Sequence, residues 1–232
     1  MGKALQNALM AAAVIGLSWA GAASATTTLT LGEGNSDIIG FPGPYGTVAI
    51  SLVNPTDAHV VFQSDNVGSN DFFFIDSSIA DVNVNASSWT LSGLVTNGLG
   101  APTITNGGSG QVDGAGAFNQ TTNQADGYGS RATTISFDLL NTGGTWSSDS
   151  LVLTPNAAGF EAAAHVAVCQ NTLANFNCGP GSSAIATGFA ANGPVGVPIP
   201  EPATWALMIV GVGGVGAALR MRRKTSMASA AV

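Results

Sequence analysis

Short runs of residues with high β-propensity recur along this chain, separated by clusters of turn-forming residues. Several runs alternate apolar and polar side chains, as in Val82-Asn83-Val84 and residues 135–139, which is typical of a strand with one buried face. No stretch between the two ends keeps an apolar period of 3.6 residues, so no amphipathic helix is expected there. The pattern predicts an all-β fold, a single antiparallel β-sandwich or jelly-roll-like domain. The expected strands are Thr27–Leu31, Thr47–Val53, His59–Gln63, Phe72–Ile75, Ala80–Val84, Trp89–Leu94, Thr133–Leu140, Ser150–Leu153 and Ala164–Val168.

Two segments interrupt this rhythm. Residues 106–129 are rich in Gly, Asn, Gln and Thr and contain few apolar residues, so we expect a long surface loop there. Residues 190–199 combine Ala, Asn, Gly, Pro and Val, which predicts a linker. The β-domain is therefore expected to span residues 26–189, which is long enough to form one hydrophobic core.

Charge is scarce in the chain and unevenly distributed. Only 8% of the residues are charged whereas 45% are hydrophobic, a balance that excludes intrinsic disorder. Residues 26–197 hold twelve carboxylates and a single base, Arg131, for a formal charge of −11 between two basic ends. Because proteins that bind nucleic acid present basic patches, this acidic body argues against a nucleic-acid partner.

The first 25 residues have the pattern of a secretory signal peptide. Lys3 supplies the positive charge, residues 8–21 are apolar apart from Ser18, and Ala23-Ser24-Ala25 is a small-residue cleavage site. We expect this segment to form a signal helix that directs export and that signal peptidase removes after Ala25.

The other end of the chain joins an uncharged stretch to a cluster of bases. Residues 203–219 carry no charge and could form a helix about 25 Å long, which can span a bilayer when flanking bases extend to the interface. The positive-inside rule places the bases, and with them the tail of residues 225–232, in the cytoplasm. These stop-transfer residues are Arg220, Arg222, Arg223 and Lys224.

Pro200-Glu201-Pro202 directly precedes this stretch, and Trp205-Ala206 lies near the beginning of it. Together with the apolar helix and the bases, residues 200–224 resemble the PEP-CTERM sorting signal in its Trp-Ala form. The resemblance implies that an exosortase, a membrane cysteine protease, recognises the Pro-Glu-Pro element and cleaves nearby. It also implies an inner-membrane intermediate followed by delivery to the cell surface or extracellular matrix of bacteria that make exopolysaccharide. It implies nothing about the activity of the β-domain.

Cys169 and Cys178 are the only cysteines of the chain. An even pair in an exported protein favours a structural disulfide. A redox or metal site would need a Cys-x-x-Cys motif or further His or Cys ligands nearby, and the Cys169–Cys178 loop holds neither.

Acidic and Asn-rich turns make calcium a candidate ligand. Asp65, Asp71 and Asp76 supply the hard oxygen atoms that calcium prefers, although their spacing is not that of an EF-hand. The alternative is that these side chains bond to their own backbone in Asx turns. No other cofactor is expected.

Familiar catalytic motifs are absent from the sequence, which has no Gly-x-Ser-x-Gly elbow, His-Glu-x-x-His helix or Walker loop. Its two histidines, His59 and His165, both lie in strand-like runs. Asp71, Asp76 and Asp81 follow one another at intervals of five, so a carboxylate pair of the glycosidase type remains an alternative.

Trp89 and Trp146 could stack on sugar rings or fill the core. We interpret the chain as an exported, non-enzymatic surface or matrix protein that an exosortase cleaves and that binds exopolysaccharide. The alternatives are a secreted hydrolase, a calcium-dependent adhesin, and an adhesin for ice or another ordered surface. The last would need a flat threonine-rich array, for which residues 26–30 alone are too short.

Overall fold

The computed structural model describes residues 26–100, 102–171, 178–179 and 181–193. The expected signal helix, sorting motif, membrane helix and cytoplasmic tail lie outside these residues. The described residues form strands and two short 3-10 turns, η2 (Gly127–Gly129) and η3 (Asp149–Leu151). The strands are β1 (Thr26–Gly34), β2 (Gly46–Asn54), β3 (Asp57–Ser64), β4 (Asn66–Val67), β5 (Asn70–Phe74), β6 (Ala80–Val82), β7 (Trp89–Leu99), β8 (Ile104–Val112), β9 (Gly116–Gln124), β10 (Arg131–Asn141), β11 (Ala162–Gln170) and β12 (Ala186–Asn192).

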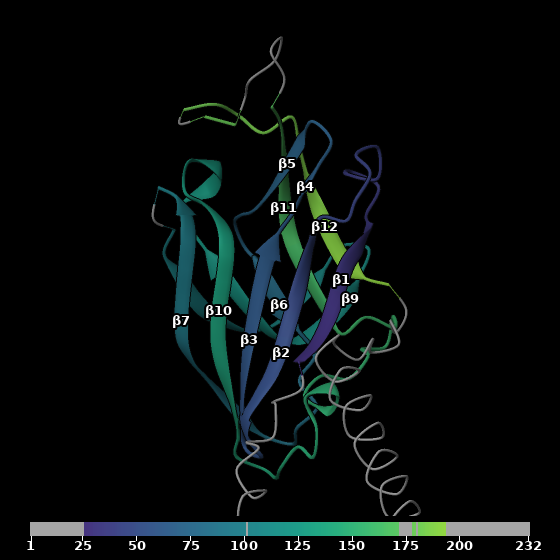
Figure 1. Ribbon diagram of the computed structural model, residues 1–232, viewed down its shortest axis with the longest axis vertical. Coiled ribbons are helices and arrows are strands. Elements are labelled where there is room, and N and C mark those ends of the chain that lie inside the picture. The colour runs from purple at the N-terminus through teal and green to yellow at the C-terminus, as the bar shows by residue number, and fades with distance from the viewer. Residues whose placement is uncertain (1–25, 101, 172–177, 180, 194–232) are drawn as a thin grey trace, which may run out of the picture. The chain divides into compact units, whose positions relative to one another are not determined.

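All twelve strands belong to one sheet, and every pair is antiparallel. The order is β4-β5-β10-β3-β2-β1-β12-β11-β6-β9-β8, with β7 paired to β10. Because β5 pairs with both β10 and β11, the path of pairings closes on itself. In Figure 1, β7, β10, β3, β2 and β1 lie side by side toward the viewer, with β6 and β9 behind them. No helix of the described residues is long and apolar enough to cross a membrane.

The predicted alternation directs one face of β1, β2, β3 and β10, which we call the front strands, into a common core, which we call the main core. In β1, Leu29 and Leu31 are buried while Thr28 and Thr30 are exposed, and β2, β3 and β10 repeat the pattern. The ring of Phe62 in β3 meets the ring of Phe74 in β5 edge-on, with 6.1 Å between centroids. Burial of each such large side chain stabilises the fold by about 1.5–3 kcal/mol.

Strand β11 is buried on both faces, and its second face carries a smaller apolar cluster. Its even-numbered residues from Ala162 to Val168 belong to the main core, whereas Ala163 packs against the end of the β8–β9 hairpin. We call this smaller group the second cluster. Its buried members are Val112, Ala115, Phe118, Ala163 and Ala191, with Phe160 and Phe189 partly buried against them.

The prediction of an antiparallel all-β fold is confirmed, but the sheet is continuous where a sandwich has two separate sheets. The physical reason is that β5 and β12 link the front strands to β11. The expected strand at residues 150–153 is wrong: residues 149–151 form η3, and only Leu153 makes an isolated bridge, to Val84.

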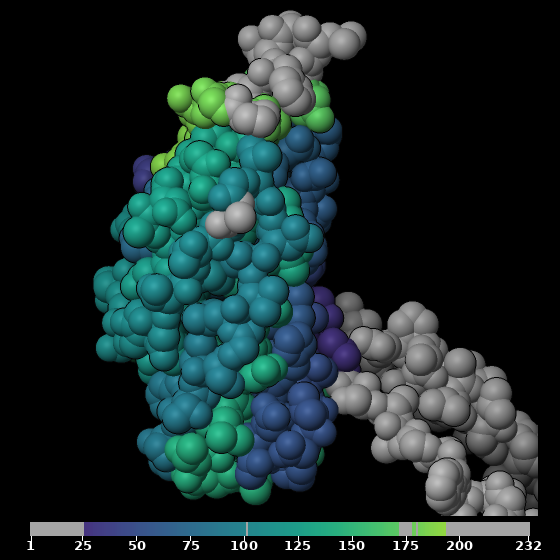
Figure 2. Space-filling model, turned by 90° about the vertical axis from the view of Figure 1, so that its left-hand side faces the viewer, coloured from purple at the N-terminus to yellow at the C-terminus, as the bar shows by residue number. Residues whose placement is uncertain are grey.

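The expected loop at residues 106–129 is also wrong, since β8 and β9 form a hairpin there. Figure 2 shows the side on which β7 lies in Figure 1, and the teal residues of the middle of the chain make up most of its surface. The buried residues of β9 are largely polar and are held by specific partners. The Thr122 hydroxyl donates to the Ala80 carbonyl, and the Trp89 indole N–H donates to the Gln120 side chain. Strand β9 is therefore held by specific polar partners, and its sequence does not alternate between apolar and polar residues as the predicted strands do.

The last strand continues past the expected start of the linker. Strand β12 pairs with β1 and β11 and ends at Asn192, with Ala190 and Ala191 buried. The Asn192 side chain accepts hydrogen bonds from the backbone N–H groups of Glu161 and Ala162. Residues 190–192 therefore belong to the sheet.

Candidate functional site

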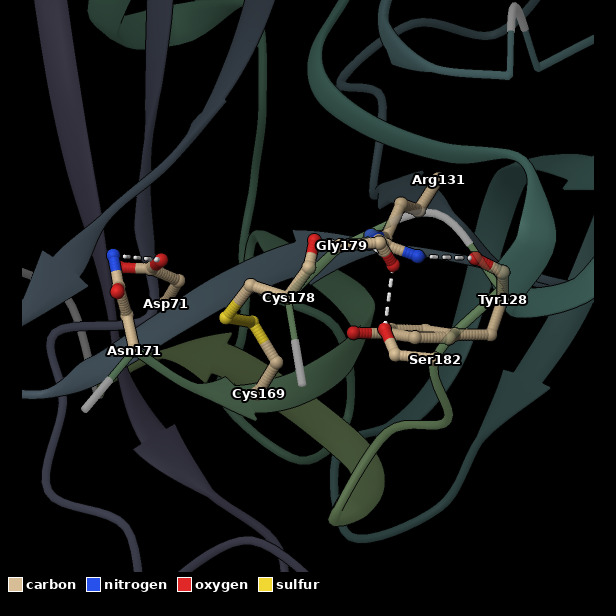
Figure 3. The surroundings of a disulfide bond; sticks show 8 residues. All are labelled: Asp71, Tyr128, Arg131, Cys169, Asn171, Cys178, Gly179 and Ser182. Carbon is tan, nitrogen blue, oxygen red and sulfur yellow. Dashed lines mark hydrogen bonds between the residues drawn. A yellow bond between two sulfur atoms is a disulfide. The ribbon is translucent and has the colours of Figure 1, made fainter. Parts of the chain in front are cut away.

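Cys169, near the end of β11, forms a disulfide with Cys178, as the sequence predicted, with 5.3 Å between the two Cα atoms (Figure 3). The Cys169 side chain is buried. The bond joins β11 to a segment that belongs to no strand, so it anchors that segment to the sheet.

Reduction of this disulfide is expected to lower the free energy of unfolding by about 2.5–3 kcal/mol, because the open chain regains the entropy of a loop of about ten residues. Urea unfolding with and without a reductant measures the difference. Alkylation of unreduced, denatured protein should label no cysteine, and two labelled thiols would contradict the pairing.

Arg131, the one base of the acidic body, is fully buried at the start of β10 beside this disulfide (Figure 3). Its guanidinium carbon lies 4.0 Å from the centre of the Tyr128 ring and 4.9 Å from that of Phe73. One guanidinium nitrogen donates to the Tyr128 carbonyl at 2.9 Å, and the other donates to the carbonyls of Cys178 and Gly179. Arg131 forms no ion pair with a carboxylate of the described residues. The sequence marks Arg131 as the single base among twelve carboxylates, but this isolation does not indicate that the side chain is buried.

The structure does not gather the three candidate calcium ligands. In the described part of the chain, the one group of three metal-capable side chains is Asp71 with Cys169 and Cys178. Sulfur atoms joined in a disulfide are not thiolate ligands, so this group cannot hold a metal as it stands. The Asp65 carboxylate accepts the backbone N–H of Asn66 at 2.8 Å, a local bond to the backbone of the kind that the alternative interpretation predicts.

The carboxylates proposed for a hydrolase also occupy different surroundings. Asp71 lies on β5, opposite Cys169 of β11. Asp76 follows β5 in a left-handed backbone conformation, with φ of 55°. Asp81 lies within β6 and is 0% exposed, so its carboxylate cannot reach a substrate in this conformation.

Of the two tryptophans considered for sugar stacking, Trp146 is a core residue. It is 3% exposed, and its indole N–H donates to the Asn85 carbonyl at 2.8 Å. Trp89 is half-buried and bonds to Gln120 at 3.0 Å. The structure therefore favours the core interpretation for Trp146.

The two histidines have different environments. The His59 Nδ1 atom lies 2.6 Å from a carboxylate oxygen of Asp138, and both side chains are about 40% exposed (40% and 39%). Gly93, with φ of 63°, leaves room for the Asp138 carboxylate, since a Cβ there would lie 2.6 Å from the other Asp138 oxygen. His165 stacks on Phe189 with 4.5 Å between ring centroids. Burial lowers the pKa of His165, while Asp76 and the Ser77 backbone oppose that shift.

The outward side chains of β1, β2, β3, β10 and β7 are aligned in rows across neighbouring strands, and we call this surface the outer face. Pairing aligns Thr30, Thr47, Gln63 and Thr134 in one row and Thr28, Ala49, Val61 and Ser136 in the next. A third row contains Thr26, Ser51, His59, Asp138 and Ser92. Rows in such a sheet repeat about every 7 Å along the strands, and neighbours within a row are about 4.8 Å apart.

Comparison with known proteins identifies one part of the chain. No curated protein and no solved structure matches the sequence. The family model of the PEP-CTERM protein-sorting motif matches residues 198–224, which include the predicted Pro-Glu-Pro element and the basic cluster. This chain is therefore a protein with a PEP-CTERM sorting motif, which implies exosortase sorting and export toward the cell surface.

Proposed function

We propose that this protein is a non-enzymatic component of the cell surface or extracellular matrix that binds exopolysaccharide. Signal peptidase removes residues 1–25, the uncharged stretch of residues 203–219 holds the intermediate in the inner membrane, and an exosortase releases the β-domain. The observation that carries the proposal is the sorting motif at residues 198–224. The burial of Asp81 and the separate surroundings of Asp71 and Asp76 support a binding role over hydrolysis.

The outer face supports polymer binding. Hydroxyl side chains recur along its rows beside exposed aliphatic ones, of which Val53 and Val95 are 63% and 61% exposed. Its His59–Asp138 pair joins opposite charges when the histidine is protonated, whereas other carboxylates of the body have no basic partner in the described residues. The outer face also carries Asp57 at the start of β3, but hydroxyl, amide and aliphatic side chains make up most of its rows. Such a face suits a neutral, hydroxyl-rich polymer, because such a polymer offers many weak hydrogen bonds.

Processing is tested by the intact mass of the protein from the cell surface and medium. We expect a chain that starts at Thr26 and ends near Pro200–Pro202. Replacing Glu201 and Pro202 with alanine should leave Arg220–Lys224 on the chain and the protein in the membrane fraction. Pro194→Ala, outside the matched residues, is the control and should be processed normally. Normal release of the double variant would contradict recognition of this element.

Binding is tested by co-sedimentation with exopolysaccharide purified from the producing cells. Thr47→Glu places a charge on the outer face, between Thr30 and Gln63, and should reduce the bound fraction, whereas Ser150→Glu, in η3, should not. Equal binding by both variants would exclude the outer face, and no binding by the unaltered protein would reject a polysaccharide role. Neither result would affect the sorting assignment.

Adhesion to an ordered surface such as ice is a second candidate that the outer face favours. Residues 26–30 are too short for this purpose alone, but pairing sets their threonines beside Thr47 and Ser51. Partition of the protein into slowly growing ice distinguishes this candidate, because a polysaccharide-binding protein would stay in the liquid.

A further inference from the structure

Asp81 is placed so that its side chain faces the second cluster. Its neighbours in β6, Ala80 and Val82, both belong to the main core. Because side chains alternate along a strand, Asp81 points to the opposite face. Pairing sets it directly across from Ala163 of β11 on one side and Thr121 of β9 on the other. Residues opposite one another in an antiparallel pair share a face, and Ala163 is a member of the second cluster.

The Asp81 carboxyl group is buried without a hydrogen-bond partner on either oxygen. Burial raises the pKa of Asp81 well above its usual range. The Ser78 hydroxyl and the Thr122 backbone amide lie close enough to oppose that shift, but neither completes a hydrogen bond of ordinary geometry to the carboxyl group. An ionised carboxylate in this position would lose its hydration without compensation, so the closed structure favours the protonated group.

Strand β6 is also the link through which the β8–β9 hairpin joins the sheet. The order of strands ends in β6-β9-β8, and β6 pairs with β11 at only two positions, Ala162↔Val82 and Ala163↔Asp81. Beyond β6, polar contacts hold the hairpin end. The Asn156 side chain donates to the carbonyls of Ala115 and Ala117, and Asn35 donates to Asp113. Separating the hairpin end from β11 would admit water to Asp81 while the main core stays closed.

We propose that Asp81 is a pH-sensitive latch: its protonated form keeps the β8–β9 hairpin closed over β11, and its ionisation opens the second cluster. Opening would expose the apolar groups beneath the hairpin, Ala163 and Ala191 with Phe160 and Phe189. This latch does not depend on the proposed polysaccharide role.

Other titratable groups on the surrounding elements are Glu161 just before β11, His165 on β11, Asp76 in the β5–β6 connection, and Asp113 at the hairpin end. Glu161 is buried, which raises its pKa, and its bond from Asn192 opposes the shift. His165 acts in the opposite direction, since its neutral form is favoured by burial and its protonation would favour opening as the pH falls. A comparison with a variant of Asp81 alone separates the latch from these groups.

The test is hydrogen exchange of the full chain between pH 5 and 9, corrected for the intrinsic exchange rate, in the unaltered protein and in Asp81→Asn. The closed state binds one proton more than the open state above the ordinary aspartate range. Protection of β9 amides, relative to the variant, should therefore fall about tenfold per pH unit over the range where Asp81 is protonated in the closed state and ionised in the open state, and should level off once Asp81 ionises in the closed state as well. Asp81→Ala serves as a second variant if the asparagine disturbs folding. Asp113→Asn, which removes an exposed carboxylate from the same hairpin and alters its bond with Asn35, is the control: any change in protection should be equal at every pH, so the pH dependence should remain.

A ratio that stays constant across the whole range would overturn the proposal. So would an equal loss of protection in β2 and β3, since that result would mean global unfolding instead of opening of the second cluster.

Discussion

Replacing Arg131 with alanine is expected to lower the free energy of unfolding by about 3–5 kcal/mol, with a fall in Tm of roughly 10–15 °C. The side chain is fully buried, and its removal leaves the carbonyls of Tyr128, Cys178 and Gly179 without this donor. It also removes contacts with the faces of the Tyr128 and Phe73 rings, each worth about 0.5–2 kcal/mol. Thermal and urea unfolding of the oxidised protein measure the change.

Arg131→Lys is the matched variant, because it keeps the charge and loses the planar fork that reaches two groups of carbonyls. We expect its stability to lie between those of the unaltered protein and the alanine variant. A loss below about 1 kcal/mol for the alanine variant would mean that water replaces the guanidinium at these carbonyls. The disulfide should still form in both variants, which thiol labelling checks.

Replacing Trp146 with alanine should also destabilise the domain by about 3–5 kcal/mol, as is typical of a large aromatic residue removed from a core. Trp146 is 3% exposed and belongs to the main core, and its indole N–H bonds to the Asn85 carbonyl. Urea unfolding provides the measurement. Trp146→Phe keeps most of the buried ring and loses the N–H, so its cost should be near 1 kcal/mol.

This result separates two interpretations of the residue. A tryptophan that serves as a sugar platform could be removed with little change in stability and a large loss of polymer binding. A core tryptophan has the opposite signature, since binding by the molecules that remain folded should be unchanged. An alanine variant with unaltered stability would contradict the buried position of Trp146.

The alternation of side chains predicted the front of the fold well. The runs beginning at Thr27, Thr47, His59 and Thr133 all lie within strands, and most of their apolar residues face the core, although Val53 and Leu140 are exposed. The prediction succeeds because successive side chains of a strand point to opposite faces. In a half-buried strand the alternation of apolar and polar residues therefore shows which face is covered. The disulfide could be predicted for a similar reason, since an exported chain with two cysteines offers one intramolecular pairing.

The sequence missed β8, β9 and β12 because their burial depends on partners that are distant along the chain. Gln120 and Thr122 are buried and form hydrogen bonds with Trp89 and Ala80. The residues that neighbour Gln120 and Thr122 in the sequence do not indicate these contacts. The environments of Arg131 and Asp81 were hidden in the same way. The sequence shows that Arg131 is an isolated base and that Asp81 is one of ten aspartates between the two ends of the chain. Neither fact indicates whether the side chain is exposed to solvent or buried.

The sequence by itself determined the sorting motif at residues 198–224 and the all-β class. It also determined which side chains of β1, β2, β3 and β10 point toward the core and which point outward. Each of these properties depends on contiguous residues, either through a motif or through the alternation of apolar and polar side chains. Tertiary structure alone decided the closure of the sheet through β5, the enclosure of Arg131 beside the disulfide and the burial of Asp81 beneath a hairpin. Burial is a property of what packs against a residue, and here the packing partners come from strands that lie far apart in the chain.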